Sequence, residues 1–562
     1  MKKIRLFISL ICCMALCACS DFLDKEQKTD INLEYEQVFK DPHRAPGFLN
    51  NAYNDLISGF SQINGNTLLA TACDDAKHSD AGSPVQFICS NSINSSYNPD
   101  DIWSAMYKGI RKCNIFLSEI DGLIAKYNSI PERERPFYKG QAYFLRAFFH
   151  FELLKRYQNI PYVDRVLDPN NEDEVYGIPQ SSFHKVVEYI SIDCDSAINL
   201  LPGRVGAGQG DFQSLLLGRP MKAAPMALKA RLLLYAASPL NNPANEKELW
   251  EAAETASADI YRNASNLGLA LRSKGEFSAI FTDPSDKNRE VIFATAAFES
   301  NSLESNNFPI SYQGKGFTNP TQELVDAFPM VATSYSNPMN RYDPDEPYKD
   351  REDRFYATIL YNDATFKNTN VEAYIGGKDG LYSTNVATKT GYYMRKFITS
   401  SINLEQGENT YKRWIFFRYA EVILNYAEAR NEVLDQPDKT VHDLLNLIRN
   451  RVGLRPFANA SQYITDKEEM REYIKKERRL EFALEDHRFW DLRRWKDAET
   501  ILNNPIHGMQ ITKDEDGKFT YTPFEVEKRT FDSKFYWYPI PRNEVLKYKN
   551  KGIDFKQNPG WD

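Results

Sequence analysis

Residues 140–154 read Gly-Gln-Ala-Tyr-Phe-Leu-Arg-Ala-Phe-Phe-His-Phe-Glu-Leu-Leu and carry the clearest periodic signal in this chain of 562 residues. Large apolar side chains recur there at steps of three and four residues, namely Phe144, Phe148, Phe151 and Leu154. This spacing is typical of a helix that buries one face. We therefore predict a helix over residues 135–157.

The same periodicity predicts further helices on both sides of this segment. They cover residues 45–58, 101–120, 183–200, 221–237, 249–262, 413–433, 439–451 and 466–495. Short connections join some neighbours into pairs, and a pair with its turns has about the 34-residue length of a tetratricopeptide unit, although the full consensus of that repeat is absent. We expect a mainly α fold of tetratricopeptide-like helix pairs with a few short β-hairpins.

Between these helices, residues 263–398 have a different composition, rich in Asn, Gly, Pro and Ser. Ten of the 32 tyrosines lie between residues 301 and 400. Loops on a rigid scaffold often carry binding residues. The tyrosines therefore either contact a ligand or fill irregular packing, and the sequence favours neither interpretation.

The N-terminus has the pattern of a secretory signal. Basic residues are followed by an apolar run over 6–18, which is shorter than the roughly 20 residues of a membrane-spanning helix. Leu16-Cys17-Ala18-Cys19 matches a bacterial lipobox, so we expect a signal peptide over 1–18 and lipidation at Cys19; the alternative is an ordinary signal peptide with incidental cysteines. Polar residues then predict a flexible tether over 19–40 and a single folded body over 41–562.

Charge and cysteine spacing exclude several classes of function. The formal net charge is −8 and there is no basic block, so nucleic acid is not an expected partner. The cysteines outside the signal form no Cys-x-x-Cys pair, which disfavours zinc. They are Cys73, Cys89, Cys113 and Cys194. The first two either form a disulfide or remain buried thiols, and we favour thiols. No metal or other cofactor is predicted.

No catalytic motif emerges from the sequence. It contains no phosphate-binding Gly-rich loop, no His-Glu-x-x-His and no Gly-x-Ser-x-Gly. Glu477 and Glu481 fall beside the apolar stripe of the 466–495 helix, for which Thr465 and Glu468 form a capping box. They are either a catalytic couple or part of a buried ion network. We favour the network, with Arg418, Glu421 and Glu428 as partners, because buried charges need partners.

Several longer motifs occur together along the chain. They are Gly140 to Leu154 followed by Ile160-Pro-Tyr-Val, Asn319-Pro-Thr-Gln-Glu-Leu-Val-Asp-Ala-Phe328, Arg418-Tyr-Ala-Glu-Val-Ile-Leu-Asn-Tyr-Ala-Glu-Ala-Arg-Asn431, Ile448-Arg-Asn-Arg-Val-Gly-Leu454, Glu477-Arg-Arg-Leu-Glu481 with His487-Arg-Phe-Trp-Asp-Leu-Arg-Arg-Trp495, Tyr538-Pro-Ile-Pro541 and Gln557-Asn-Pro-Gly-Trp561. In this order they resemble the SusD/RagB family of outer-membrane lipoproteins. The resemblance extends from Cys19 almost to the last residue.

The resemblance implies a SusD-like α-superhelix without catalytic activity, anchored by lipid to the outer membrane and facing the cell surface. It also implies a SusC-like TonB-dependent transporter as partner. Ligand contacts would come from variable loops. The candidates are Asp75, Phe87 and Tyr97 in the first loop, and Phe298, Tyr382, Tyr392, Tyr393 and Arg395 in the later insert.

The expected function is therefore capture of an oligosaccharide or polysaccharide and its delivery to the transporter. One alternative is capture of peptides or glycoconjugates by the same arrangement. A second alternative is a surface glycosidase, which requires two carboxylates at a defined separation.

Overall fold

Helix α7 (Arg135–Tyr157) has the bounds that the phenylalanine spacing predicts. Phe144, Phe148 and Phe149 are buried along it. On one side α7 packs against α5 (Trp103–Ile120), where Gly109 permits a close approach. A Cβ atom at Gly109 would lie 2.7 Å from the Phe149 ring, so the contact between these helices requires glycine there.

The computed structural model describes residues 34–63, 67–203, 218–285, 287–331, 342–458 and 460–561. The predicted signal peptide and the lipidation site at Cys19 lie outside these residues. No helix within the described ranges is both long and apolar enough to cross a bilayer.

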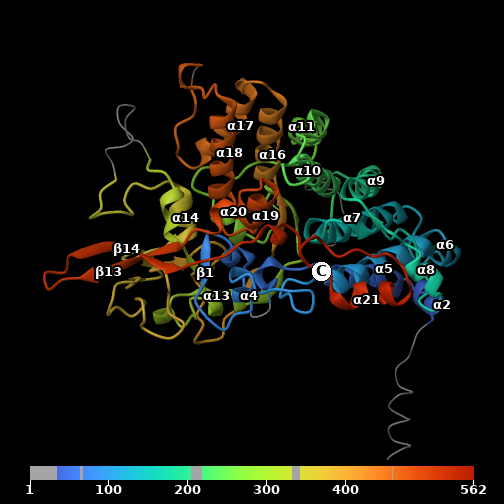
Figure 1. Ribbon diagram of the computed structural model, residues 1–562, viewed down its shortest axis with the longest axis horizontal. Helices are drawn as coiled ribbons and strands as arrows, with labels where there is room; N and C mark the ends of the chain where they lie inside the picture. The colour runs from blue at the N-terminus through green and yellow to red at the C-terminus, as the bar shows by residue number, and fades with distance from the viewer. Residues whose placement is uncertain are drawn as a thin grey trace, which may run out of the picture.

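Long helices continue on both sides of α7 and form one stack (Figure 1). The others are α3 (Arg44–Ala52), α9 (Phe183–Leu200), α10 (Ala223–Ala237), α11 (Lys247–Arg262), α16 (Tyr419–Val433), α17 (Lys439–Arg451) and α18 (Lys467–Glu481). Neighbours pack in the order α3, α5, α7, α9, α10, α11, α16, and α16 contacts both α17 and α18. The predicted mainly α fold is confirmed, and so is the pairing of α10 with α11 and of α16 with α17.

Shorter helices occupy the connections and the loop-rich part. They are α2 (Tyr35–Phe39), α4 (Val85–Cys89), α6 (Leu123–Tyr127), α8 (Glu172–Tyr176), α12 (Ala279–Thr282), α13 (Ser302–Asn307), α14 (Gln322–Ala327), α15 (Asp353–Thr358), α19 (His487–Arg494), α20 (Ala498–Ile501) and α21 (Arg542–Asn550). Figure 1 shows α13 and α14 beside the loop-rich part and α21 beside α5. The predicted insert over 263–398 thus contains short elements between its loops.

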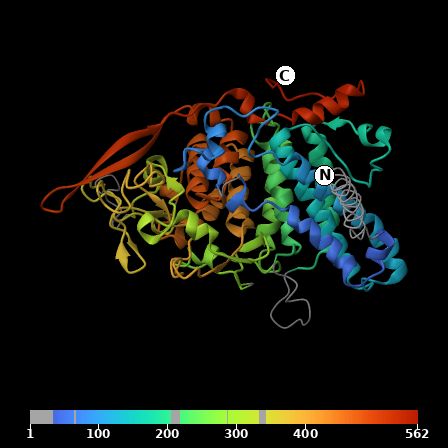
Figure 2. The same ribbon diagram turned by 90° about the horizontal axis from the view of Figure 1, so that it is seen from below.

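The strands of the described residues pair as antiparallel two-stranded sheets. The pairs are β1 (Ala76–His78) with β6 (Thr318–Pro320), β2 (Ile160–Pro161) with β3 (Gln180–Ser181), β4 (Val291–Ala294) with β12 (Ile415–Arg418), β5 (Phe298–Ser300) with β11 (Thr410–Lys412), β7 (Ile359–Leu360) with β10 (Tyr393–Met394), β8 (Thr365–Phe366) with β9 (Thr369–Asn370), and β13 (Ile506–Lys513) with β14 (Phe519–Glu527). The last pair forms a long hairpin, and it projects from the end of the molecule opposite α5 and α6 (Figures 1 and 2).

Several predicted element boundaries are wrong. The predicted helix over 45–58 ends at Ala52. The predicted helix over 466–495 is two helices, because Leu484 and Asp486 adopt positive φ angles of 65° between α18 and α19. Its N-cap is Asp466, which accepts a hydrogen bond from the Glu469 amide at 2.8 Å, and not Thr465. The predicted helix over 413–433 begins at Tyr419, since the preceding residues form strand β12.

The folded body also begins earlier than predicted. Helix α2 lies inside the predicted 19–40 tether, and its Phe39 is fully buried. The Phe39 and Phe48 rings lie 5.0 Å apart between centroids. Among the described residues the tether prediction is therefore wrong from Tyr35 onward, because an aromatic anchor there joins the core.

Two large hydrophobic clusters fill the interior. One lies among the stacked helices and includes Phe144 and Phe148, and the other lies in the loop-rich part and includes Phe355 and Met394. Figure 2 shows the blue-to-green helices at one end and the yellow loop-rich part at the other. The loop-rich part therefore has an interior of its own on which surface loops can be held.

The cysteines within the described residues are free and buried, as favoured from the sequence. The Cys73 thiol donates to the Ala70 carbonyl, and the Cys89 thiol lies 3.5 Å from the Thr71 carbonyl. These thiols pack as small apolar groups with local partners.

Candidate functional site

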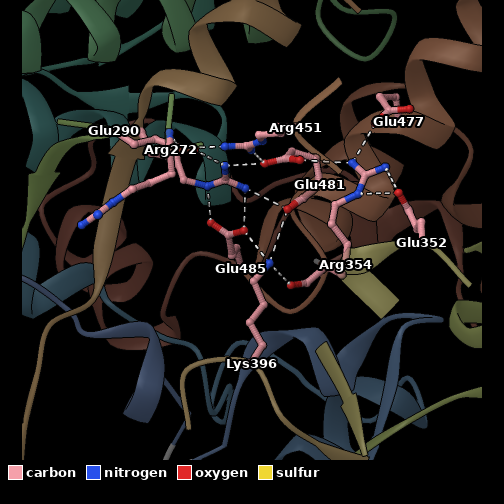
Figure 3. A network of polar contacts seen from close by, with 11 residues as sticks. Arg272, Glu290, Glu352, Arg354, Lys396, Arg451, Glu477, Glu481 and Glu485 are labelled. Carbon is pink, nitrogen blue, oxygen red and sulfur yellow. Dashed lines mark hydrogen bonds and ion pairs between the residues drawn. The ribbon is translucent and has the colours of Figure 1, made fainter. Parts of the chain in front are cut away.

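Glu477 and Glu481 lie in the interior, at the end of α18. Nη1 of Arg354 lies 2.7 Å from a Glu477 oxygen and 3.1 Å from a Glu481 oxygen, so one guanidinium joins the two carboxylates (Figure 3). Their side chains are 3% and 0% exposed, which leaves no access for a substrate. The interpretation as a buried ion network is confirmed, and this pair is not a catalytic couple.

The network extends from Glu481 to residues on a neighbouring strand and on neighbouring helices. Arg418, the last residue of β12, contacts Glu481 and also Glu290 at 3.0 Å. Figure 3 shows Glu290, Arg451 and Lys396 converging on the same centre. Burial opposes ionisation of Glu481, but the charges of Arg451, Arg418 and Arg354 outweigh it and hold its pKa below the usual range.

Two of the predicted partners belong to other contacts. Glu421 pairs with Arg231 at 2.6 Å, and Glu428 forms hydrogen bonds with both guanidinium nitrogens of Arg494. The partners of Glu481 come instead from α15, β12 and α17, which a helical periodicity does not reveal. The network therefore joins the helix stack to the loop-rich part.

Three of the predicted ligand residues are also interior. Asp75 is fully buried, with its Oδ1 atom 2.8 Å from Nε of Arg479. Tyr392 donates its hydroxyl to Gln322 at 2.7 Å, and Tyr393 donates to the Asp379 carbonyl at 2.8 Å. The prediction that these three contact a ligand is wrong, because each side chain is enclosed and already has an internal partner.

The first-loop residues Phe87 and Tyr97 do lie at the surface. They are 44% and 43% exposed, and their ring centroids lie 4.9 Å apart in an edge-on arrangement. Phe87 lies on the short helix α4, and the turn that ends at Tyr97 is held by reciprocal backbone hydrogen bonds between Asn94 and Tyr97. Tyr97 also borders a hollow of about 200 Å³ next to Arg542 of α21. This loop thus presents aromatic surface in a fixed position.

The remaining predicted residues, Phe298, Tyr382 and Arg395, belong to the loop-rich part. Tyr382 is the most exposed of them at 74% and adopts a positive φ angle. Phe298 on β5 borders a hollow of about 150 Å³ with hydroxyl groups from Ser58 and Ser300. Arg395 follows β10 and lines a separate cleft. The structure does not bring all of these residues into one pocket.

Sequence analysis missed a wide groove of about 580 Å³ in the loop-rich part. Tyr312, Tyr374 and Phe519 supply its aromatic surface. Its polar lining includes Asn362, Asp363, Asn368, Asn370, Glu372, Lys378 and Lys513. The concentration of tyrosines over 301–400 is the signal that pointed toward this surface, but Phe519 comes from the distant hairpin strand β14.

The aromatic wall of this groove is pre-arranged. The Tyr374 and Phe519 ring centroids lie 5.6 Å apart, and Nζ of Lys513 lies 5.2 Å from the Tyr374 ring and 5.5 Å from that of Phe519. The Tyr312 hydroxyl lies 2.7 Å from the Thr369 hydroxyl. The groove is therefore lined by aromatic rings and by hydroxyl groups whose positions are held by these contacts.

One amide in the groove lacks internal hydrogen bonds. Neither Oδ1 nor Nδ2 of Asn362 has a partner of ordinary geometry within the described ranges, although the residue is only 2% exposed. The Tyr521 hydroxyl lies close enough to interact weakly with this amide. Buried polar groups without partners are costly, and they are common where a ligand completes the hydrogen bonding.

The groove combines surfaces for apolar stacking with amide, carboxylate and ammonium groups for hydrogen bonding. Such a combination suits a ligand that is rich in hydroxyl groups and has flat apolar faces. Within the part of the chain that the structure describes, no group of His, Cys, Asp and Glu has the arrangement of a metal site. The geometry makes this groove the candidate binding surface, and the loop-rich part carries it.

Two family models match this chain. The model described as the SusD family covers residues 279–561, and one described as starch-binding associating with outer membrane covers residues 21–234. The chain belongs to the SusD family, as the resemblance of its motifs predicted.

Relatives and solved structures agree with this assignment. The SusD-like proteins P38 and P2 of Formosa agariphila are 24% and 25% identical over 74% and 75% of this chain, covering 77% and 74% of their own lengths. The crystal structure of a SusD-like protein from Bacteroides fragilis is 28% identical with a TM-score of 0.75, over 93% of this chain and 98% of that one. A SusD-like carbohydrate binding protein from the same organism shares the fold, with 24% identity and a TM-score of 0.72 over 91% and 98% of the chains.

Proposed function

We propose that this protein is a non-catalytic lipoprotein that captures oligosaccharide at the cell surface and delivers it to a SusC-like TonB-dependent transporter. Membership of the SusD family supports this proposal, as does the match of residues 21–234 to a family described as starch-binding and associating with the outer membrane. The carbohydrate-binding relative from Bacteroides fragilis supports it at the level of fold.

The groove bordered by Tyr312, Tyr374 and Phe519 is the observation that carries the proposal. Sugar rings have flat faces of C–H groups that pack on aromatic side chains, while their hydroxyls donate hydrogen bonds to carboxylates and exchange hydrogen bonds with amides. Its volume of about 580 Å³ lies within the range of about 300–1,000 Å³ usual for ligand pockets. The exposed Phe87 and Tyr97 rings provide a second aromatic surface for a longer chain.

Weak binding is expected for an isolated oligosaccharide. Capture of a flexible chain costs translational and conformational freedom, and only the surplus of stacking and hydrogen bonding appears as affinity. We therefore expect dissociation constants of about 1 µM or weaker. The transporter partner would then raise the effective affinity by enclosing the bound glycan.

The anchor completes the arrangement. Lipidation at Cys19 followed by the polar residues up to about 34 would hold the folded body beside the membrane on a short tether. Because more than one acyl chain gives stable anchorage, membrane attachment would be permanent. A Cys19→Ala protein is expected in the soluble fraction of cells that lack the transporter, and unchanged membrane partitioning there would exclude the anchor.

Isothermal titration calorimetry of the mature protein against a panel of plant, host and microbial oligosaccharides tests the proposal. For a glycan that binds, Tyr374→Ala should weaken affinity at least tenfold. Tyr411→Ala is the matched control, because Tyr411 is 55% exposed on β11 and does not line the groove.

Three outcomes would count against the proposal. If no glycan of the panel binds and peptide fragments do, capture of peptides or glycoconjugates would be favoured. Release of shortened products from a bound glycan would identify a glycosidase. Equal losses in Tyr374→Ala and Tyr411→Ala would exclude the groove as the binding site. For the partner, co-purification with a large β-barrel protein in mild detergent is the expected result.

A further inference from the structure

Arg395 stands at a cleft in the loop-rich part that is distinct from the groove described above. The cleft has a volume of about 270 Å³. Hydroxyl side chains of Ser278, Thr282, Thr399 and Ser400 line it beside Arg395, and no carboxylate does. The chain has 77 acidic side chains, so a cleft whose lining lacks them is unusual. Because hydroxyls and cations line it, the cleft disfavours positively charged ligands.

The Arg395 backbone is fixed at the mouth of this cleft. Its amide donates to the Thr358 carbonyl at 2.8 Å, directly after the β7–β10 pairing, and its carbonyl accepts from the Ile398 amide at 3.1 Å. Phe397 adopts a positive φ angle of 69° in the turn between them. The guanidinium is therefore presented by a rigid turn.

Among the residues that the structure describes, no carboxylate pairs with this guanidinium. Within the described ranges Arg395 makes no ion pair and no side-chain hydrogen bond, although the residue is half-buried. The buried arginines of the network differ, since Arg354 and Arg418 each contact several carboxylates. Burial lowers the pKa of Arg395, with Tyr361 as the neighbouring polar group that opposes this effect. Partial burial of a cation without a counter-ion costs free energy, unless a bound ligand supplies the negative charge.

Lys396, the other cation at the cleft, is already neutralised. Its Nζ atom lies 2.7 Å from Glu485 and donates to the Ala483 carbonyl at 2.9 Å, so it faces the buried network. A negative group entering the cleft would meet Arg395 and the surrounding hydroxyls. Guanidinium forms two parallel hydrogen bonds with a carboxylate, and serine and threonine hydroxyls can donate to the same oxygens.

The cleft also adjoins an aromatic surface. Nζ of Lys412 donates to the Phe397 carbonyl at 2.8 Å and to the Thr399 hydroxyl at 2.9 Å, and Lys412 lines the hollow beside exposed Phe298 as well. The two hollows therefore share a wall. A sugar ring on Phe298 would place its neighbouring unit close to the Arg395 cleft.

We propose that the Arg395 cleft is an anion subsite, which binds the carboxylate of an acidic sugar unit in the captured glycan. This inference rests on the proposed function for the nature of the cargo, but not for the binding of an anion. A sulfate ester on the glycan is also an anion that a guanidinium can bind. The labelling experiment below distinguishes the sugar carboxylate from the sulfate ester.

Calorimetry of the mature protein with trigalacturonate and with its methyl-esterified form tests the charge requirement on one carbohydrate skeleton. We expect the acid to bind at least tenfold more tightly than the ester, and Arg395→Leu to abolish that difference. Arg395→Lys should keep part of it, because it retains charge without the paired donors. Arg133→Leu, which removes a highly exposed arginine, is the control for net charge and should behave as wild type. Equal binding of acid and ester, or an unchanged difference in Arg395→Leu, would overturn the proposal.

Chemical modification gives a readout that does not depend on glycan capture. Phenylglyoxal labelling with peptide mass spectrometry should modify Arg395, and glucuronate should protect it whereas glucose should not. Stronger protection by inorganic sulfate than by glucuronate would assign the cleft to sulfate esters and overturn the carboxylate assignment. Protection by glucuronate without binding of any glycan would support the anion subsite and count against the proposed function. No protection by either anion would overturn the subsite.

Discussion

Nη1 of Arg418 lies 2.6 Å from Oε1 of Glu481, and the two side chains are 2% and 0% exposed. Arg418 ends strand β12 and Glu481 ends helix α18, so this ion pair fastens the strand that precedes α16 to the end of α18. Glu481 also faces Arg451 of α17 and Arg354 of α15. One carboxylate thereby serves three guanidinium groups from three segments.

Removal of that carboxylate should be strongly destabilising. Glu481→Gln leaves the guanidinium groups with less compensation in a buried site, and loss of one partner from a buried pair costs about 3–5 kcal/mol. Urea denaturation followed by circular dichroism measures the loss. Glu525→Gln alters an exposed side chain of the hairpin and should change stability by less than about 0.5 kcal/mol. Comparable losses in both variants would contradict the structural role of the network.

Gly59 and Gly47 should respond in opposite directions to substitution by alanine. A Cβ atom at Gly59 would lie 2.3 Å from two carbons of the buried Trp414 ring, which cannot retreat without disturbing Phe60 and Phe397. We expect Gly59→Ala to cost about 2 kcal/mol or more. Nothing lies within 4 Å of such an atom at Gly47, inside helix α3, so Gly47→Ala should stabilise by about 0.5–1 kcal/mol. Thermal unfolding of both variants checks the signs, and a stable Gly59→Ala protein would exclude the close packing.

Asp486 should make the stability of the protein depend on pH. Burial raises its pKa to about 8, with nearby Asp100 adding to the effect and Lys155 and Arg156 opposing it. An unfolded aspartate titrates near 4, so the native state holds a proton between these values that the unfolded chain has released. The stability from this group is complete below about pH 4 and is lost as pH rises through 8.

Asp486→Asn removes this titration and suits the positive φ angle of 65° at that position. The stability advantage of the variant over wild type should therefore grow from pH 4 to pH 8, by about 1.4 kcal/mol for each pH unit over which only the native state holds the proton, and then stay constant. Denaturant midpoints at a series of pH values measure it. An advantage that is the same at every pH would show that Asp486 does not titrate in this range.

The buried cysteines should be inert in the native protein. Burial raises the pKa of the thiols of Cys73, Cys89, Cys113 and Cys194, so the reactive thiolate is scarce and reagents have no access. Iodoacetamide at pH 8 should label these positions only after denaturation, as mapped by peptide mass spectrometry. Rapid labelling of the native protein, or a peptide joined through Cys73 and Cys89, would contradict this arrangement.

The sequence predicted the regular helices well because their signal is local. Three of them, α7, α9 and α17, have the expected bounds, since apolar spacing alone positions an amphipathic helix. The break after α18 was missed because it depends on left-handed backbone at Leu484 and Asp486, which no spacing reveals. Tertiary contacts with the ion network impose that break.

The binding surfaces were predicted less well for a different reason. Tyr392 and Phe87 are both aromatic residues outside the long helices, yet one is fully buried and the other is 44% exposed. Composition does not separate these cases, because exposure depends on contacts such as the hydrogen bond from Tyr392 to Gln322. The groove was missed since its aromatic rings, Tyr312, Tyr374 and Phe519, meet only in the folded chain.

The ion network in the interior stabilises the fold, whereas the surface loops line the hollows. This separation has an evolutionary consequence. The ion pairs of Arg418 and Glu481 do not involve Tyr374 of the groove or the exposed Phe298. Substitutions at Tyr374 or Phe298 can therefore change the solvent-facing surface while the framework is kept. The Bacteroides fragilis structure agrees with this separation, because the fold is retained there at 28% identity with a TM-score of 0.75.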